Sequence, residues 1–207
     1  TRDRKFRPSA QRAINFIVSS QHSAGGWRYA PRTAGDTSVL GWQVLALKSA
    51  MQAGLKVPKS TFSKAAQFLD SVQAHKSGAT YGYMPGRQES PAMSAEGLLS
   101  RIYTGWKTDA ASLKLGAEYL LTVMPQTYPD IYYWYYATQV MHKYGGTTWT
   151  RWNTGIRDFL IARQDQAGHA RGSWPVAGGH DSTGGRLYAT SLCLLTLQVY
   201  YRHAKGE

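Results

Sequence analysis

The sequence is poor in cysteine, in acidic residues and in long hydrophobic runs. Cys193 is the only cysteine, so no disulfide can form within the chain. No apolar run reaches the length of about 18 residues that a membrane-spanning helix needs, so we expect no transmembrane segment. Asp and Glu together number only 12 and are mostly isolated in the sequence, so we expect no catalytic pair of carboxylates.

Basic and aromatic residues are abundant instead. Lys and Arg number 24, which gives a net charge of +12, and the chain holds 14 Tyr and 7 Trp. The basic residues are scattered apart from residues 2–7, and no nucleic-acid-binding motif occurs, so we expect no nucleic-acid partner. With 207 residues, 43% of them apolar, we expect one folded domain over 1–207. The start at Thr1 rather than Met favours a piece of a longer protein.

Hydrophobic periodicity predicts an all-α fold. Helix starts and stops are marked by Pro8, by the capping segment 36–38 and by glycines such as Gly54 and Gly145. The strongest extended candidate is 81–84, and it is short. The expected helices are 8–21, 37–53, 59–74, 91–105, 109–124, 131–144, 149–164 and 185–203.

The predicted helices alternate in character. The first, third and fifth carry one apolar stripe, whereas 39–47 and 192–201 are apolar nearly all round and 131–137 has aromatic residues on every face. Amphipathic helices lie at a surface and helices that are apolar all round are buried. This alternation predicts about four helical hairpins in an α/α toroid, as a partial or open ring with an inner and an outer layer. Cys193 is then a buried small apolar residue.

One segment occurs twice, after the first and the seventh predicted helix. In each copy a Gln at the helix end is followed by a Gly-rich turn and a Trp. We expect the glycine to allow a tight turn, the Gln to bond free N–H groups of a following helix, and the Trp to cover that helix end. The two sets are Gln21, Gly25 and Trp27, and Gln164, Gly172 and Trp174.

These residues carry a resemblance to a known repeat. Ala13, Phe16 and Ile17 before the first set, and Gly155, Phe159 and Leu160 before the second, complete the QW motif of squalene–hopene and oxidosqualene cyclases. The chain also resembles the β subunits of protein prenyltransferases. Both resemblances imply an α/α toroid.

The catalytic motifs of these families are incomplete here. Cyclases of this type use an Asp-x-Asp-Asp acid motif, and the matching segment 33–36 keeps only Asp36, with Gly35 at the proton-donor position. Asp36 is therefore either a catalytic remnant or a helix N-cap. Prenyltransferases bind zinc through Asp, Cys and His, and the last two are replaced by Ser38 and Ala189, so we expect no metal site and no cofactor.

Two further groups are candidate site residues. Aromatic side chains on inner helices either stabilise a cation or fill the core. The expected ligand-lining residues are Trp42, Tyr132, Tyr133, Trp134, Tyr136 and Arg186. His180 and Asp181, in the Gly-rich loop 178–185, are either a catalytic base with its orienting acid or a structural pair. We expect this loop to share a rim with 33–36, where helix N-termini favour anions and four arginines add charge: Arg28, Arg32, Arg87 and Arg186.

The resemblance favours a toroid without the known catalytic motifs. It would act as a binding or interaction module for an apolar or isoprenoid ligand or for a protein partner. An active terpenoid cyclase-type enzyme, with acids from hairpins outside this chain, is one alternative. A glycan-binding or glycan-cleaving toroid is another, by analogy of fold alone.

Overall fold

The computed structural model describes residues 4–178 and 180–202, and it is all-helical. Within these residues the extended candidate at 81–84 forms no strand, only isolated bridges of Tyr81 with Gln73 and of Gly82 with Glu89. A 3-10 turn at Arg4–Phe6 precedes the helices. These are α1 (Arg7–Ser20), α2 (Thr37–Gln52), α3 (Lys59–Val72), α4 (Pro91–Thr104), α5 (Ala111–Thr122), α6 (Ile131–Tyr144), α7 (Gly146–Arg163), α8 (His180–Leu197) and α9 (Val199–Arg202).

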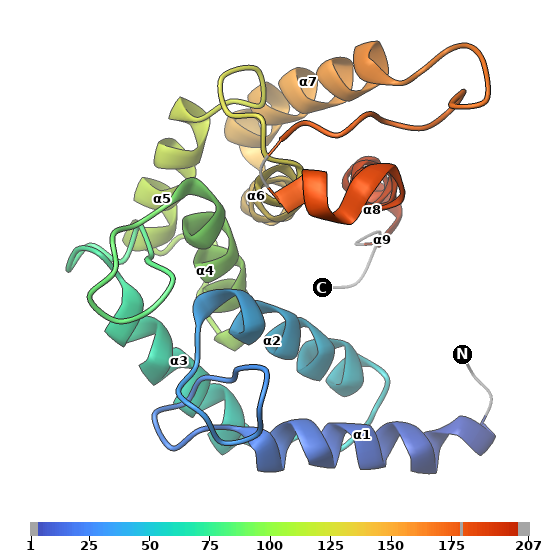
Figure 1. Cartoon of the computed structure of the whole chain (residues 1–207). Helices are drawn as coiled ribbons and strands as arrows, with labels where there is room; N and C mark the ends of the chain where they lie inside the picture. The colour runs from blue at the N-terminus through green and yellow to red at the C-terminus, as the bar shows by residue number, and fades with distance from the viewer. Residues whose placement is uncertain (1–3, 179, 203–207) are drawn as a thin grey trace.

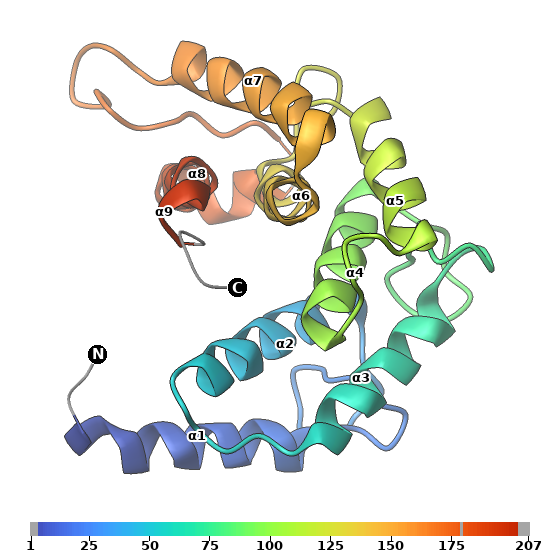
Figure 2. The ribbon, with the colours of Figure 1, turned by 180° about the vertical axis from the view of Figure 1, so that it is seen from behind.

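The helices form a curved arc of two layers (Figure 1). The odd-numbered helices α1, α3, α5 and α7 lie along the outside, and α2, α4, α6 and α8 lie along the inside. Each inner helix packs against the next one along the arc. Seen from behind, α1 and α8 lie on opposite sides of the opening of the arc (Figure 2). The predicted alternation of four hairpins is therefore present, in an open form.

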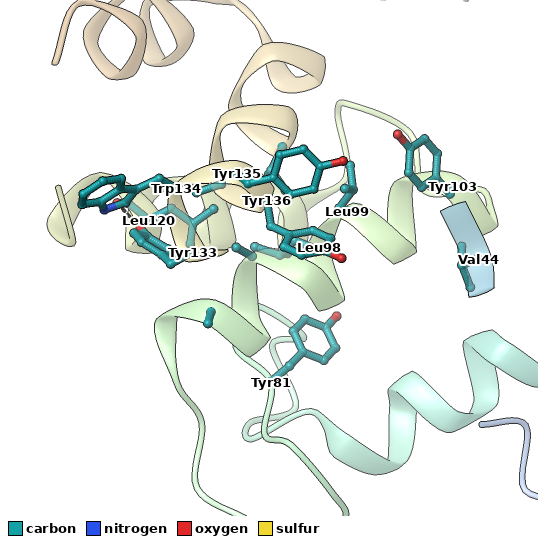
Figure 3. Packing of buried hydrophobic residues seen from close by; sticks show 14 of the residues in the cluster. Val44, Tyr81, Leu98, Leu99, Tyr103, Leu120, Tyr133, Trp134, Tyr135 and Tyr136 are labelled. Atoms are coloured by element: carbon teal, nitrogen blue, oxygen red, sulfur yellow. Dashed lines mark hydrogen bonds between the residues drawn. The ribbon is translucent and has the colours of Figure 1, made fainter. Parts of the chain in front are cut away.

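Burial follows the position of each helix in the arc. The outer helices bury one stripe each; α7, for example, buries Trp152, Ile156 and Leu160. The central inner helices α4 and α6 each pack against two inner and two outer helices, and each bury ten residues. Figure 3 shows Tyr133 and Trp134 of α6 on the side of Leu120, and Tyr136 on the side of Leu98. Cys193 is buried as predicted, and burial raises its pKa to about 12.

The prediction of full burial is wrong for the two inner helices at the ends of the arc. On α2 the Trp42 side chain is 43% exposed, and on α8 Leu187 and Leu194 are 80% and 44% exposed. Each of these helices has an inner neighbour on one side only, so apolar residues on its other side face solvent. A short helical segment from His180 precedes the last predicted helix, and a non-helical break at Gly185, where φ is 70°, separates the two, so the predicted start at 185 coincides with the break.

The duplicated segments have the same geometry. Each indole N–H donates to the carbonyl three residues before the end of the outer helix, Trp27 to Ile17 at 2.8 Å and Trp174 to Leu160 at 2.7 Å. Gln21 donates to the Gly25 carbonyl at 2.8 Å, and Gln164 to that of Gly172 at 2.9 Å.

Our expectation for the partners of this motif was wrong in detail. The Gln amides donate to carbonyls rather than accepting N–H groups, because each Gly turn directs its own carbonyl back towards the Gln. The Trp residues cover the end of the preceding helix instead of the following one. A third copy of the motif, which was not predicted from the sequence, follows α3. Gln73 ends α3 with the same backbone conformation as Gln21, and Tyr81 takes the backbone place of the tryptophan, because its carbonyl accepts from the N–H of the next helix cap, Ser90, as that of Trp27 does from Asp36.

Candidate functional site

A cleft of about 710 Å³ lies where the N-terminal ends of the four inner helices meet. Each inner helix contributes to its wall, and the loops before α2, α4 and α6 complete it. Residues from the starts of α2 and α8 face the same cleft, so the segments around 36 and around 183 share one rim, as the repeat predicts. Its lining residues are Tyr29, Ser38, Val39, Trp42, Tyr83, Ser90, Ala92, Met93, Tyr128, Asp130, Tyr132, Thr183, Gly184 and Tyr188.

Two of the six predicted ligand-lining residues line this cleft, Trp42 and Tyr132. Trp42 is the centre of an aromatic cluster that connects α2 with α6. Its ring centroid lies 6.5 Å from that of Tyr132 and 5.8 Å from that of Tyr136, and it stacks on Tyr135 at 6.2 Å. The cluster therefore forms one aromatic wall, part of it open to solvent.

The other four predicted lining residues lie elsewhere. Tyr133 donates to the Leu120 and Val123 carbonyls at the end of α5, and Trp134 packs edge-on against Phe159 of α7. Tyr136 is buried behind Trp42. These differences arise because α6 packs against α4, α5, α7 and α8, so only a few of its side chains can face one cleft. Arg186 pairs with Asp165 and donates to Ser173, away from the cleft wall.

The N-termini of three inner helices, α2, α4 and α6, are capped by the chain's own side chains. Asp36 is fully buried, and its Oδ1 accepts bonds from the Val39 N–H at 2.8 Å and from the Ser38 hydroxyl at 2.7 Å. This confirms the N-cap interpretation. Ser90 caps α4 and Asp130 caps α6 in the same way. Each cap occupies one of the N–H groups that an anion would use at these helix starts.

Charge in the cleft also differs from the predicted anion site. No Lys, Arg or His is among the described residues that line it, and Asp130 is the one side chain there that is normally ionised. Arg28 lies beside the cleft with its guanidinium 3.8 Å from Asp36 Oδ2, and it covers the rings of Tyr29 and Tyr83. Arg32 donates to the Ser19 carbonyl, and Arg87 is exposed.

Glu96, a carboxyl behind the aromatic wall, was not predicted from the sequence. Glu96 lies on α4 and is fully buried. The Tyr132 hydroxyl lies 3.0 Å from each of its carboxyl oxygens, and Tyr136 and Asp36 lie close enough to affect its charge. Burial raises the pKa of Glu96 well above its usual range, which favours the protonated, neutral carboxyl. Burial and the neighbouring Glu96 also raise the pKa of Tyr132.

A glycine on the neighbouring inner helix α2 is the feature of the sequence that relates to the burial of Glu96. A Cβ added at Gly41 of α2 would lie 2.1 Å from Glu96 Oε1, so only glycine leaves room for the carboxyl. Within an apolar helix, Gly41 is a position where something approaches closely. The sequence alone does not identify Glu96 as that neighbour.

The second predicted pair is only partly described. The side chain of His180 lies outside the described residues. Asp181 is buried, and its Oδ2 accepts a bond from the Ala177 N–H at 3.3 Å, so it helps to fix the loop before α8. Across the described ranges, no three His, Cys, Asp or Glu side chains form a group that could hold a metal ion. No described helix is long and apolar enough to cross a membrane.

Comparison with known proteins adds no relative to this picture. No protein-family model matches the chain, and no curated protein matches it either.

Proposed function

We propose that this chain is a binding module whose ligand occupies the aromatic cleft at the N-terminal rim of the inner helices. The observation that carries the proposal is the cleft itself. Its volume of about 710 Å³ falls within the size range of small-molecule sites, and Tyr and Trp rings dominate its wall. Such rings offer apolar area with a few polar atoms at their edges. A small organic molecule with apolar surface is the ligand class that fits this lining.

The resemblance to the cyclase and prenyltransferase toroids supports the same proposal. The hairpin repeat, the two QW segments and the inner and outer layers agree with it. The proton-donor position of the cyclases is Gly35, where an added Cβ would lie 2.6 Å from Gly26 Cα. A carboxylic acid therefore does not fit at that position. We infer a toroid-like module that binds a ligand without the acid motif of the cyclases.

Titration with a neutral isoprenoid alcohol, farnesol, tests this function. We expect isothermal titration calorimetry to show one binding site on the wild-type chain. Trp42→Leu removes the centre of the aromatic wall and should weaken binding about tenfold, the size of one lost aromatic contact. Tyr201→Leu, a change at an 82% exposed ring outside the cleft lining, is the matched control and should bind as wild type. Equal affinity of both variants would contradict the proposed site.

Binding of a protein partner is a second candidate function, and an exposed phenylalanine on α1 favours it. Phe68 and Phe159, five residues before Gln73 and Gln164, pack against the preceding hairpin, on Gly26 and on Trp134 respectively. Phe16 has the same place before Gln21, yet it is 62% exposed and lines a groove of about 380 Å³.

We infer that a helical hairpin from outside this chain covers Phe16. Crosslinking from a photoreactive amino acid at position 16, in cells that produce the protein, should capture a helical polypeptide. The same group at position 201 is the control, and equal capture from both positions would contradict the inference.

A further inference from the structure

The wall of the aromatic cleft has the opposite charge balance to the chain as a whole. The chain carries 24 basic and 12 acidic residues, yet the described lining of the cleft includes no basic side chain and one carboxylate, Asp130. Salt screens distant surface charges beyond about 8 Å, so groups at the cleft decide what binds there. The local charge therefore favours a cation over an anion.

Carboxyl groups also lie directly behind the aromatic wall. Glu96 accepts a hydrogen bond from the hydroxyl of Tyr132, which lines the cleft. Asp36 accepts a hydrogen bond from the hydroxyl of Ser38, another lining residue. Both carboxyls are fully buried. Aromatic ring faces are negative, so the wall itself attracts positive charge, and a carboxyl group behind it adds to this attraction when it ionises.

One cation already binds at this rim in the way that a ligand would. The Arg28 guanidinium lies 6.0 Å from the Tyr29 ring centroid, 5.7 Å from that of Tyr83 and 3.8 Å from the Asp36 carboxylate. Tyr29 and Tyr83 line the cleft as well. Further inside, the rings of Trp42, Tyr132 and Tyr188 have no cationic partner among the cation–π pairs of the described residues.

We propose that the ligand of this cleft is a small organic cation, a quaternary or protonated amine with apolar substituents, held by Trp42 and Tyr132 with Asp130 at the rim and Glu96 behind. This inference rests on the proposed binding function and names its ligand class. Aromatic rings bind quaternary ammonium groups because the cation loses little hydration and lies against negative ring faces. The apolar substituents account for the remaining aromatic lining.

Glu96 couples such binding to protons. Burial raises its pKa and favours the neutral form, and the groups that face it are Tyr132, Tyr136, Asp36 and Tyr188. A cation on the other side of the Tyr132 ring stabilises the ionised carboxylate and lowers its pKa. Binding below that pKa therefore releases a proton to solvent. By linkage, affinity for the cation rises as pH rises towards the pKa of Glu96.

A pair of isosteric probes tests the charge directly. Choline and 3,3-dimethylbutan-1-ol have the same shape, and only choline is charged. We expect choline to bind about tenfold or more tightly, the size of one or two cation–aromatic contacts. Calorimetry in phosphate and in HEPES should give different apparent enthalpies for choline, since the released proton is taken up by the buffer. Equal affinities of the two probes would overturn the inference and leave the proposed function standing.

Three variants separate the parts of the site. Glu96→Gln keeps the neutral shape and should abolish both the buffer dependence and the rise of affinity with pH. Asp130→Asn keeps an N-cap for α6, because Asn caps as well as Asp, and should weaken choline binding severalfold without affecting the neutral probe. Asp158→Asn, at a 58% exposed carboxylate on α7, is the control and should change neither. Unchanged proton release in Glu96→Gln would remove Glu96 from the site.

Complete absence of choline binding would also overturn the inference. Farnesol then decides the proposed function separately, because it tests the aromatic cleft without charge. Farnesol binding without choline binding leaves a neutral ligand site. Absence of both removes the cleft as a ligand site.

Discussion

The first and last repeats of the arc contain the same motif in different surroundings. Trp27 and Trp174 are almost equally buried, at 2% and 3% exposed, and make the same indole bond to their own outer helix. The first turn, however, is covered by α3, and Gln21 extends a second bond of 3.0 Å to the Thr61 carbonyl. The last turn has no following hairpin in this chain. Each copy of the motif therefore forms its own internal bonds. The packing of a following outer helix on the turn decides how much the stability of the protein depends on that copy.

Replacing either tryptophan should cause the largest loss of stability, and the loss should be similar in the first and the last repeat. Trp27→Ala and Trp174→Ala each leave a cavity and should each lower the free energy of unfolding by about 3–5 kcal/mol. The two losses should be similar because the indoles have the same burial and the same hydrogen bond. Urea denaturation measures both. A loss at Trp174 of less than half that at Trp27 would show that the last repeat is held together differently.

The glycines should separate the two repeats clearly. Both have positive φ, 96° at Gly25 and 83° at Gly172, so alanine costs about 1–2 kcal/mol at either position. At Gly25 the added Cβ would also lie 1.9 Å from the Lys64 carbonyl oxygen of α3, whereas nothing lies within 4 Å at Gly172. Overpacking adds about 1–3 kcal/mol. Thermal unfolding should show Gly25→Ala as the more destabilised variant, and equal shifts would contradict the packing of α3 on this turn.

The difference between local bonds and packing on a neighbour also explains which features could be predicted from the sequence. Helix positions follow from local signals that act within a few residues, such as the cap at Asp36 and the glycine at 145, and the expected ranges agree closely with α1 to α7. The exposed faces of α2 and α8 depend on which neighbours are present, and periodicity holds no information about that. The third repeat at Gln73 was missed because Tyr81 replaces the tryptophan that marks the other two.

The candidate site was harder to predict than the fold. Trp42 and Tyr132 were identified because aromatic residues on inner helices are conspicuous. Tyr133 and Trp134 look the same in sequence, and only the rotation of α6 turns them towards α5 and α7. Glu96 was missed because a single Glu in a helix normally faces solvent. Its burial depends on space left by Gly41 of another helix.

The phenylalanines five residues before Gln21 and Gln164 should differ in how much they stabilise the packing of one hairpin on the preceding one. Phe159 contacts Trp134 of the preceding hairpin, with ring centroids 5.2 Å apart, so Phe159→Ala should cost about 1–3 kcal/mol. Phe16 has no preceding hairpin in this chain and is 62% exposed, so Phe16→Ala should change stability by no more than about 0.5 kcal/mol. Chemical denaturation of the two variants checks this. A large loss at Phe16 would mean that α1 is covered by something in solution.

Replacing the glutamines should give the smallest difference in stability between the two repeats, and this difference comes from a single hydrogen bond. Gln164→Ala removes one bond, to Gly172, near the surface, and should cost about 0.5–1.5 kcal/mol. Gln21→Ala removes two, and the bond to Thr61 is the one that joins consecutive outer helices, so its cost should be about twice as large.

A double-mutant cycle with Gly25→Ala isolates the stacking. Because Gly25→Ala already displaces α3, Gln21→Ala should cost less in that background than in the wild type. Additive losses would mean that the Thr61 bond contributes nothing to stacking.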